Sequence, residues 1–113
     1  MKIPRIASEW KILYKPENHG DYINDHSIVR GPDGKWHLFC HTMIGVYHYE
    51  SNDGISFKNM GRIVNRAMRP DINIIDGKYY LFYERTKPLI GNALALVGGK
   101  WKSEIYCTES TDL

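Results

Sequence analysis

Residues 22–42 read Tyr-Ile-Asn-Asp-His-Ser-Ile-Val-Arg-Gly-Pro-Asp-Gly-Lys-Trp-His-Leu-Phe-Cys-His-Thr. Asp25 comes directly before a short apolar run, and Gly31-Pro32-Asp33-Gly34 follows it as a turn, because proline fixes φ and glycine accepts positive φ. Residues 35–42 carry bulky side chains at alternate positions on both faces, which is typical of a strand covered on both sides. The stretch therefore predicts a β-hairpin whose first strand begins with a carboxylate.

A second copy of this pattern follows later in the chain. The segment Asp-Gly-Lys-Tyr-Tyr-Leu-Phe at residues 76–82 matches residues 33–39 at an offset of 43. The same comparison matches Asp71 with Asp25 at an offset of 46, if the first turn is three residues longer than the second. Two hairpins of one kind are therefore expected, each with its own carboxylate.

Further similarities extend each hairpin into a four-strand unit. Residues 105–112 resemble residues 46–53, and residues 57–64 precede the second hairpin much as residues 10–14 precede the first. We interpret the chain as two units, each written with its outer strand first and three inner strands after it. Repeats of this length with aromatic strands are typical of β-propeller blades.

The predicted fold is all-β, with two four-stranded antiparallel propeller blades in a single domain over residues 1–113. The first unit is assigned to residues 9–54 and the second to residues 55–113, with an insertion at 86–102. Propellers use about four to eight blades. We therefore expect either a homo-oligomer or the remaining blades of a longer chain to complete the ring.

Composition narrows the choice of partners. Fifteen basic and thirteen acidic residues are interleaved, for a formal charge of +2. No Lys/Arg stripe is visible, so neither a nucleic acid nor a membrane is an expected partner. The two cysteines, Cys40 and Cys107, form either one disulfide or a buried thiol pair, and the second alternative suits a reducing compartment. We expect a cytoplasmic protein, or a secreted one if a signal peptide was removed.

A metal centre is not expected. His37 and His41 are four residues apart, which on a strand separates them by about 13 Å. The chain also contains neither a Cys-x-x-Cys nor a His-Glu-x-x-His motif. No metal and no cofactor is therefore assigned.

The segment Asn-Asp-His-Ser-Ile-Val-Arg at residues 24–30, followed by Asp-Gly-Lys-Trp-His-Leu-Phe, resembles the opening blade of the five-bladed propeller glycosidases. These are the family 43 and 62 enzymes and their relatives in families 32, 68 and 117. Residues 69–83 resemble the blade that supplies their second Asp. The resemblance implies a carbohydrate partner and hydrolysis of furanosides, pentosides or related sugars derived from polysaccharides.

The resemblance implies roles for individual residues of this chain, according to their positions in the matched motifs. Asp25 matches the Asp that serves as general base in the inverting families or nucleophile in the retaining ones, and Asp71 matches the Asp that holds the sugar or tunes the acid. The general acid of these families is a Glu from a later blade, and no position here matches its motif. His26 stands where the families usually have Pro, and Ile72 stands where they often have a second one.

The candidate site combines these matches with the neighbouring polar residues. Glu84 and His41 end equivalent strands, so both are expected to point at one polar pocket, and Arg69 could clamp a substrate hydroxyl or carboxylate. The catalytic candidates are Asp25, Asp71 and Glu84, and the substrate-binding candidates are Asn24, His26, His41, Arg69 and Trp36.

Structural alternatives stay open for each of these residues. Asp25 and Asp71 could cap their own strands. Glu84 could form a salt bridge with Arg69 or Arg85. Trp36 could be blade core, with Trp10 or Trp101 stacking on the sugar. The alternative function is a non-catalytic carbohydrate-binding or structural propeller module.

Overall fold

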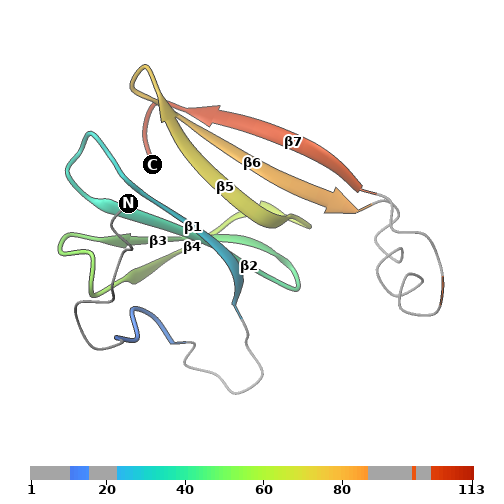
Figure 1. Ribbon diagram of the computed structural model, residues 1–113, viewed down its shortest axis with the longest axis horizontal. Coiled ribbons are helices and arrows are strands. Elements are labelled where there is room, and N and C mark those ends of the chain that lie inside the picture. Colours follow the sequence, from blue (N-terminus) through green and yellow to red (C-terminus); the bar gives the residue numbers. More distant parts are fainter. Residues whose placement is uncertain (1–10, 16–22, 87–97, 99–102) are drawn as a thin grey trace, which may run out of the picture.

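The computed structural model describes residues 11–15, 23–86, 98 and 103–113. In them the chain forms two antiparallel sheets with the strand orders β1-β2-β3-β4 and β5-β6-β7 (Figure 1). The strands are β1 (Asn24–Arg30), β2 (Trp36–Thr42), β3 (Gly45–Ser51), β4 (Lys58–Asn65), β5 (Met68–Ile75), β6 (Lys78–Thr86) and β7 (Ser103–Ser110). The predicted all-β fold is confirmed.

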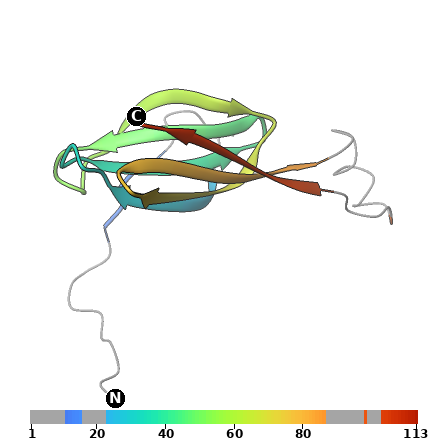
Figure 2. The same ribbon diagram turned by 90° about the horizontal axis from the view of Figure 1, so that it is seen from above.

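The two sheets pack face to face. Figures 1 and 2 both show β5 lying along β1, so the first strands of the two sheets are neighbours. The core between the sheets is made of fully or almost fully buried side chains from both: Phe39, Val46, Ala67, Ile72, Tyr79, Leu81 and Tyr83. Burying one large apolar side chain contributes about 1.5–3 kcal/mol, so this layer accounts for much of the attraction between the sheets.

The far face of the first sheet is covered as well. Leu38, Cys40 and Tyr49 are buried there, under a layer that consists of Tyr14, Ile23, Tyr47 and Phe57. Strand β2 is therefore buried on both faces, as the bulky residues on both sides of residues 35–42 predicted. No helix among the described residues is long and apolar enough to cross a membrane.

The two hairpins turn by different local means. Between β1 and β2, Gly31 N–H donates to the Lys35 carbonyl at 2.8 Å, and the Asp33 carboxylate accepts the Lys35 N–H at 3.0 Å. Between β5 and β6 the turn is Asp76-Gly77, with positive φ at both residues (49° and 76°), as a two-residue hairpin turn requires. Residues 31–35 join β1 to β2 and residues 76–77 join β5 to β6, so the first loop is three residues longer, as predicted. Strands β5 and β6, however, pair one position further toward their turn, so that equivalent pairs of the two ladders differ by one residue only.

The register of the two ladders corrects the match between Asp25 and Asp71. Asp71 pairs with Phe82, and the equivalent residue of β2, Phe39, pairs with Ser27. Ser27 and Asp71 are 44 positions apart in the sequence. The structural counterpart of Asp71 is therefore Ser27, and the offset of 46 was wrong.

The expected strand order also needs correction. Strand β4 pairs with β3 and completes the first sheet, whereas we expected residues 57–64 to open the second unit. The reason is a local turn, in which the Asp53 carboxylate accepts the N–H groups of Ile55 and Ser56 at 2.8 and 2.9 Å and folds the chain back after β3. The first sheet thus runs from its first strand to its fourth in chain order, and the described part of the second sheet has three strands.

Residues 11–15 do not form the expected outer strand. Tyr14 instead packs against Tyr49 on the far face of the first sheet, with 4.5 Å between the centroids of the two tilted rings. Residue 10, the tryptophan at 101 and nearly all of the 86–102 insertion lie outside the described residues.

Neither prediction for the cysteines holds. Cys40 and Cys107 are both free, and Cys40 is buried whereas Cys107 is exposed. The pairing of β6 with β7 explains why Cys107 is exposed. Cys107 pairs with the partly exposed Phe82, on the side of β6 that faces away from the first sheet.

Candidate functional site

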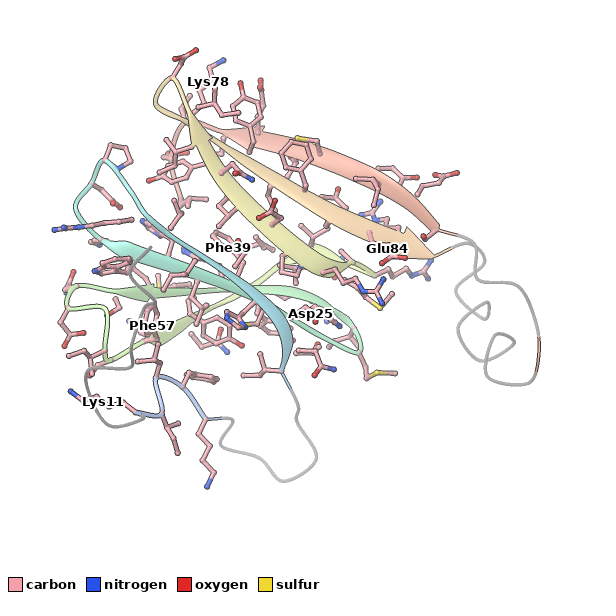
Figure 3. The ribbon with its side chains drawn as sticks, viewed as in Figure 1. Lys11, Asp25, Phe39, Phe57, Lys78 and Glu84 are labelled. Atoms are coloured by element: carbon pink, nitrogen blue, oxygen red, sulfur yellow. The ribbon has the colours of Figure 1, made fainter. Side chains whose placement is uncertain are left out.

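Four polar side chains, one from each of β1, β2, β5 and β6, meet at one end of the paired sheets. The Asp25 Oδ2 atom lies 3.7 Å from Arg69 Nε and 3.8 Å from His41 Nδ1. Arg69 Nη1 lies 2.9 Å from Glu84 Oε2. We call these four residues the polar cluster, and Figure 3 shows Asp25 and Glu84 at the same end of the two sheets.

Two β-bulges orient the side chains of Asp25 and Arg69 in the polar cluster. In β1, Asn24 pairs with His41 and His26 pairs with Cys40, so that Asp25 is the extra residue. In β5 the register shifts between Met68 and Asp71. Bulges bend a strand and re-aim a side chain, and here they turn Asp25 and Arg69 toward each other.

Both bulge residues have a left-handed backbone. The φ angle is 35° at Asp25 and 51° at Arg69. An Asp tolerates this conformation better than most residues, but for Arg it costs about 1–2 kcal/mol. The contacts of the Arg69 backbone and side chain offset that cost.

His41 joins the two sheets. Its Nδ1 atom accepts the backbone N–H of Arg69 at 3.2 Å, so the neutral ring carries its proton on Nε2. The pKa of His41 is lowered, chiefly because the ring is buried, while the nearby Asp25 carboxylate acts in the opposite direction. A neutral His41 is therefore the form that holds the Arg69 backbone in place.

Glu84 holds the Arg69 side chain. The Glu84 side chain is 6% exposed, whereas that of Arg69 is 62% exposed. A buried carboxylate needs a charged or hydrogen-bonded partner, and Arg69 supplies one. The sequence analysis considered Glu84 as a catalytic residue and as a salt-bridge partner of Arg69 or Arg85. The geometry shows the salt bridge with Arg69.

Asp25 is the exposed acid of the cluster. Its side chain is 58% exposed, and it faces the Nε edge of Arg69, whose Nη1 is bound to Glu84. Asn24 and His26 flank Asp25 at the bulge and are exposed. The cluster therefore presents one carboxylate and one guanidinium side by side to solvent.

Asp71 has other partners. Its Oδ1 accepts the Ser27 hydroxyl at 3.2 Å and its Oδ2 accepts the Asn73 side-chain amide at 3.1 Å. Ser27 in turn accepts the backbone N–H of Ile72 at 3.1 Å. Asp71 therefore takes part in a link between β1 and β5, which is a structural role that the sequence did not indicate.

Trp36 is not brought to the cluster. It begins β2, whereas His41 lies near the end of the same strand, and five residues of strand span about 16 Å. The ring has the Arg30 guanidinium 5.8 Å from its centroid and lies close to Gly54. It therefore packs at the opposite end of the sheet.

A second polar group, Asp33, His37 and His48, was missed by the sequence analysis. His37 Nε2 lies 3.0 Å from Asp33 Oδ2, and His37 Nδ1 lies 2.9 Å from His48 Nε2. Both rings are buried, and His48 stacks on Phe39. Burial, and then the neighbouring His37, lower the pKa of His48 to about 4. The alternation of His37 with Leu38 was the available signal, because it places His37 on the same face as Phe39.

Among the described residues, no group of three or more His, Cys, Asp or Glu side chains is arranged to hold a metal ion. This statement does not extend to residues 1–10, 16–22, 87–97 and 99–102, which lie outside that part of the chain.

The comparisons with known proteins bear on the fold. No protein-family model and no curated protein matches the sequence. A solved structure, the GH43 endo-arabinanase from Bacillus licheniformis, is similar to this chain with a TM-score of 0.58 and 19% sequence identity. The fold is that of part of a GH43 propeller. The likeness covers 84% of this chain and 34% of that protein's chain, so this chain spans about a third of its length.

At that identity the likeness shows the fold alone. The resemblance read from residues 24–39 and 69–83 is thus confirmed for architecture.

Proposed function

We propose that this chain is a glycosidase-type propeller unit whose polar cluster binds a furanoside or a pentoside. Asp25 is its base or nucleophile. The observation that carries the proposal is the exposed Asp25 carboxylate at the start of β1, 3.7 Å from Arg69 Nε, in a fold shared with part of a GH43 propeller. An arabinose polymer is the first substrate to test, because the similar structure is named an endo-arabinanase.

The chemistry of sugars fits this pair. A carboxylate accepts hydrogen bonds from sugar hydroxyls, and a guanidinium donates to hydroxyl or ring oxygens with fixed geometry. In glycoside hydrolysis an ionised carboxylate either attacks the anomeric carbon or removes a proton from the attacking water.

The proton donor is not assigned. Hydrolysis also needs a second carboxyl group that protonates the leaving oxygen. Within the described residues, Glu84 is bound to Arg69 and Asp71 to Ser27 and Asn73. The proposal therefore places the base or nucleophile in this chain and leaves the donor open.

Because Glu84 and Asp71 are both bound to other side chains, a second candidate function is favoured, which is carbohydrate binding without turnover. In that case Asp25 and Arg69 act only as hydrogen-bonding partners of the sugar. The two candidates share a binding site and differ in bond cleavage, so one set of variants separates them.

The test uses the full chain with arabino-oligosaccharides and aryl arabinofuranosides, measuring released sugar and, by calorimetry, binding. Asp25→Asn should abolish hydrolysis, whereas Asp76→Asn should not, because Asp76 lies in the distant β5–β6 turn and Asn accepts positive φ there. Binding without release of sugar would support the second candidate. Absence of both binding and hydrolysis, or full hydrolysis by the Asp25 variant, would reject the assignment of the site.

A further inference from the structure

Three arginines from the two sheets gather around Asn65, the last residue of β4. Arg62 lies on the same strand, and its Cδ atom is 3.1 Å from the place of a Cβ atom on Gly45, the residue that pairs with Asn65. Arg85, on β6 of the second sheet, donates from Nη2 to the Asn65 carbonyl at 3.4 Å. Arg66 follows Asn65 directly and is exposed. We call Arg62, Arg66 and Arg85 the arginine group.

Contacts with the backbone hold this group in place. Arg66 has a left-handed φ of 54°, and its N–H donates to the Ile44 carbonyl of the β2–β3 turn at 3.0 Å. Arg85 shares the inward side of β6 with Tyr83, a core residue, because side chains alternate along a strand. It therefore approaches Asn65 from the opposite sheet, although the two residues are 20 positions apart in the sequence.

The arginine group forms no ion pair in the part of the chain that the structure describes, where the ion pairs join other residues. The Arg85 Nε atom is buried and has no hydrogen-bond partner there, and the guanidinium lies 5.4 and 5.2 Å from the ring centroids of Tyr83 and Tyr106. Glu104 pairs with Arg85 along the strands, but its Oε2 accepts the Tyr106 hydroxyl at 2.6 Å. The positive charge of the group is thus available to a ligand.

Cations that are held close together without a carboxylate favour an anion. Their mutual repulsion falls when a negative group binds between them. A single exposed ion pair contributes little, but several guanidinium groups can donate hydrogen bonds to one anion in a fixed geometry. Carboxylates and sulfate esters are the anionic groups that sugars carry, and both have oxygens that accept such bonds.

The arginine group lies beside the polar cluster. Arg69 follows Asn65 by four residues, so their Cα atoms are at most about 14 Å apart. Glu84, which binds Arg69, is the neighbour of Arg85 on β6. One oligosaccharide can therefore contact both groups.

We infer that the sugar held at the polar cluster belongs to an anionic oligosaccharide, whose carboxylate or sulfate ester binds the arginine group. This inference rests on the proposed function, because it assumes a sugar at Asp25 and Arg69, and it narrows the substrate class from neutral to acidic glycans. Attraction between the charges would also raise the local concentration of such a substrate.

The test compares sugars of similar length by calorimetry with the full chain: a neutral arabino-oligosaccharide, an oligosaccharide of uronic acids and a sulfated oligosaccharide. At low ionic strength one of the anionic sugars should bind about tenfold more tightly than the neutral one, and added salt should reduce this preference. The anionic sugar with the larger gain identifies the group that is bound. Equal affinities for all of these sugars overturn the inference and leave the proposed function standing.

Substitutions of the arginine group locate the anion site. Arg62→Gln and Arg66→Gln should each reduce the preference for the anionic sugar by about threefold or more, and the affinity for the neutral sugar should stay the same. Arg85→Gln should act in the same way, with circular dichroism to check its fold, because its side chain packs on two tyrosine rings. Lys58→Gln is the matched control, since it removes a charge from the exposed start of β4, about 23 Å along the strand from Asn65. It should keep the preference.

Asp25→Asn separates this inference from the proposed function. It should weaken the binding of neutral and anionic sugars alike, whereas the arginine variants weaken the binding of the anionic sugars alone. A preference that all of the arginine variants retain overturns the inference, whatever Asp25→Asn does. Binding that falls in the arginine variants and not in Asp25→Asn rejects the polar cluster as the sugar site, and with it the proposed function, but keeps the anion site. Absence of binding for every sugar overturns both.

Discussion

Asp25 and Arg69 occupy equivalent bulges in the first strands of the two sheets, and their side chains face each other across the sheet boundary. Both have left-handed φ angles, 35° and 51°, and Asp25 Oδ2 lies 3.7 Å from Arg69 Nε. The cross-strand partners of the two bulges, His41 and Glu84, are also equivalent and complete the cluster. One backbone irregularity, used twice, thus brings opposite charges together.

Arg69→Ala should destabilise the protein by about 1–3 kcal/mol, because it leaves the buried Glu84 carboxylate without its cation. Urea denaturation measures the change. Arg69→Ala combined with Glu84→Gln should recover part of the loss, since the charge is then removed. Lys58→Ala, at an exposed position of β4, should change stability by less than about 0.5 kcal/mol. If Arg69→Ala costs no more than Lys58→Ala, the pair does not stabilise the fold.

Acid should destabilise the protein through His48. Its pKa in the folded protein is lowered to about 4 from the ordinary 6.5, chiefly by burial. Between these values the unfolded chain binds a proton that the folded chain excludes, so stability falls as the pH is lowered from 6.5 toward 4. A shift of this size corresponds to about 3 kcal/mol.

His48→Gln isolates this contribution. The Gln amide can still donate to His37 Nδ1, but it does not titrate. The free energy of unfolding, measured between pH 7 and pH 4.5, should lose most of its pH dependence in the variant. His41 contributes a slope of the same sign, because burial lowers its pKa too, so some dependence remains. An unchanged slope in His48→Gln would exclude His48 as the main source.

Gly45→Ala should be more harmful than Gly34→Ala. A Cβ atom on Gly45 would overlap the Val64 carbonyl of the neighbouring strand, whereas one on Gly34 has no neighbour within 4 Å. Gly34 has a φ of 81°, so its substitution costs only the left-handed conformation, about 1 kcal/mol. We expect a loss of roughly 3 kcal/mol or more for Gly45→Ala. Thermal unfolding of both variants ranks them, and the reverse order would contradict the β3–β4 pairing described above.

Ser27→Ala should loosen the contact between β1 and β5. The Ser27 hydroxyl accepts the Ile72 N–H at 3.1 Å and donates to Asp71 at 3.2 Å. Its loss leaves both groups without this partner and costs about 1–3 kcal/mol. Hydrogen exchange at the Ile72 amide should accelerate in the variant. Ser56→Ala, in the exposed β3–β4 loop, serves as the control. Equal exchange at Ile72 in the two variants would show that the link is weak.

The sequence by itself determined the strands and the hairpins. Alternation of bulky side chains at residues 35–42 and the turn residues Asp76-Gly77 act over a few neighbours, so they can be read directly from the chain. The position of Asp25 just before an apolar run was also visible in this way. The resemblance to glycosidase propellers rested on such local segments, and the fold agrees with it.

Only the tertiary structure decided how the strands group and which side chains meet. The second ladder pairs one position further toward its turn than the first, and this register moved the counterpart of Asp71 to Ser27. The Asp53 turn joined β4 to the first sheet, whereas the sequence analysis had assigned residues 55–113 to the second unit. Arg69 reached Asp25 and Glu84 because two bulges and the packing of the sheets brought it there. Strand register and cross-sheet contacts join residues far apart in the chain, and a one-residue slip changes which face each side chain occupies.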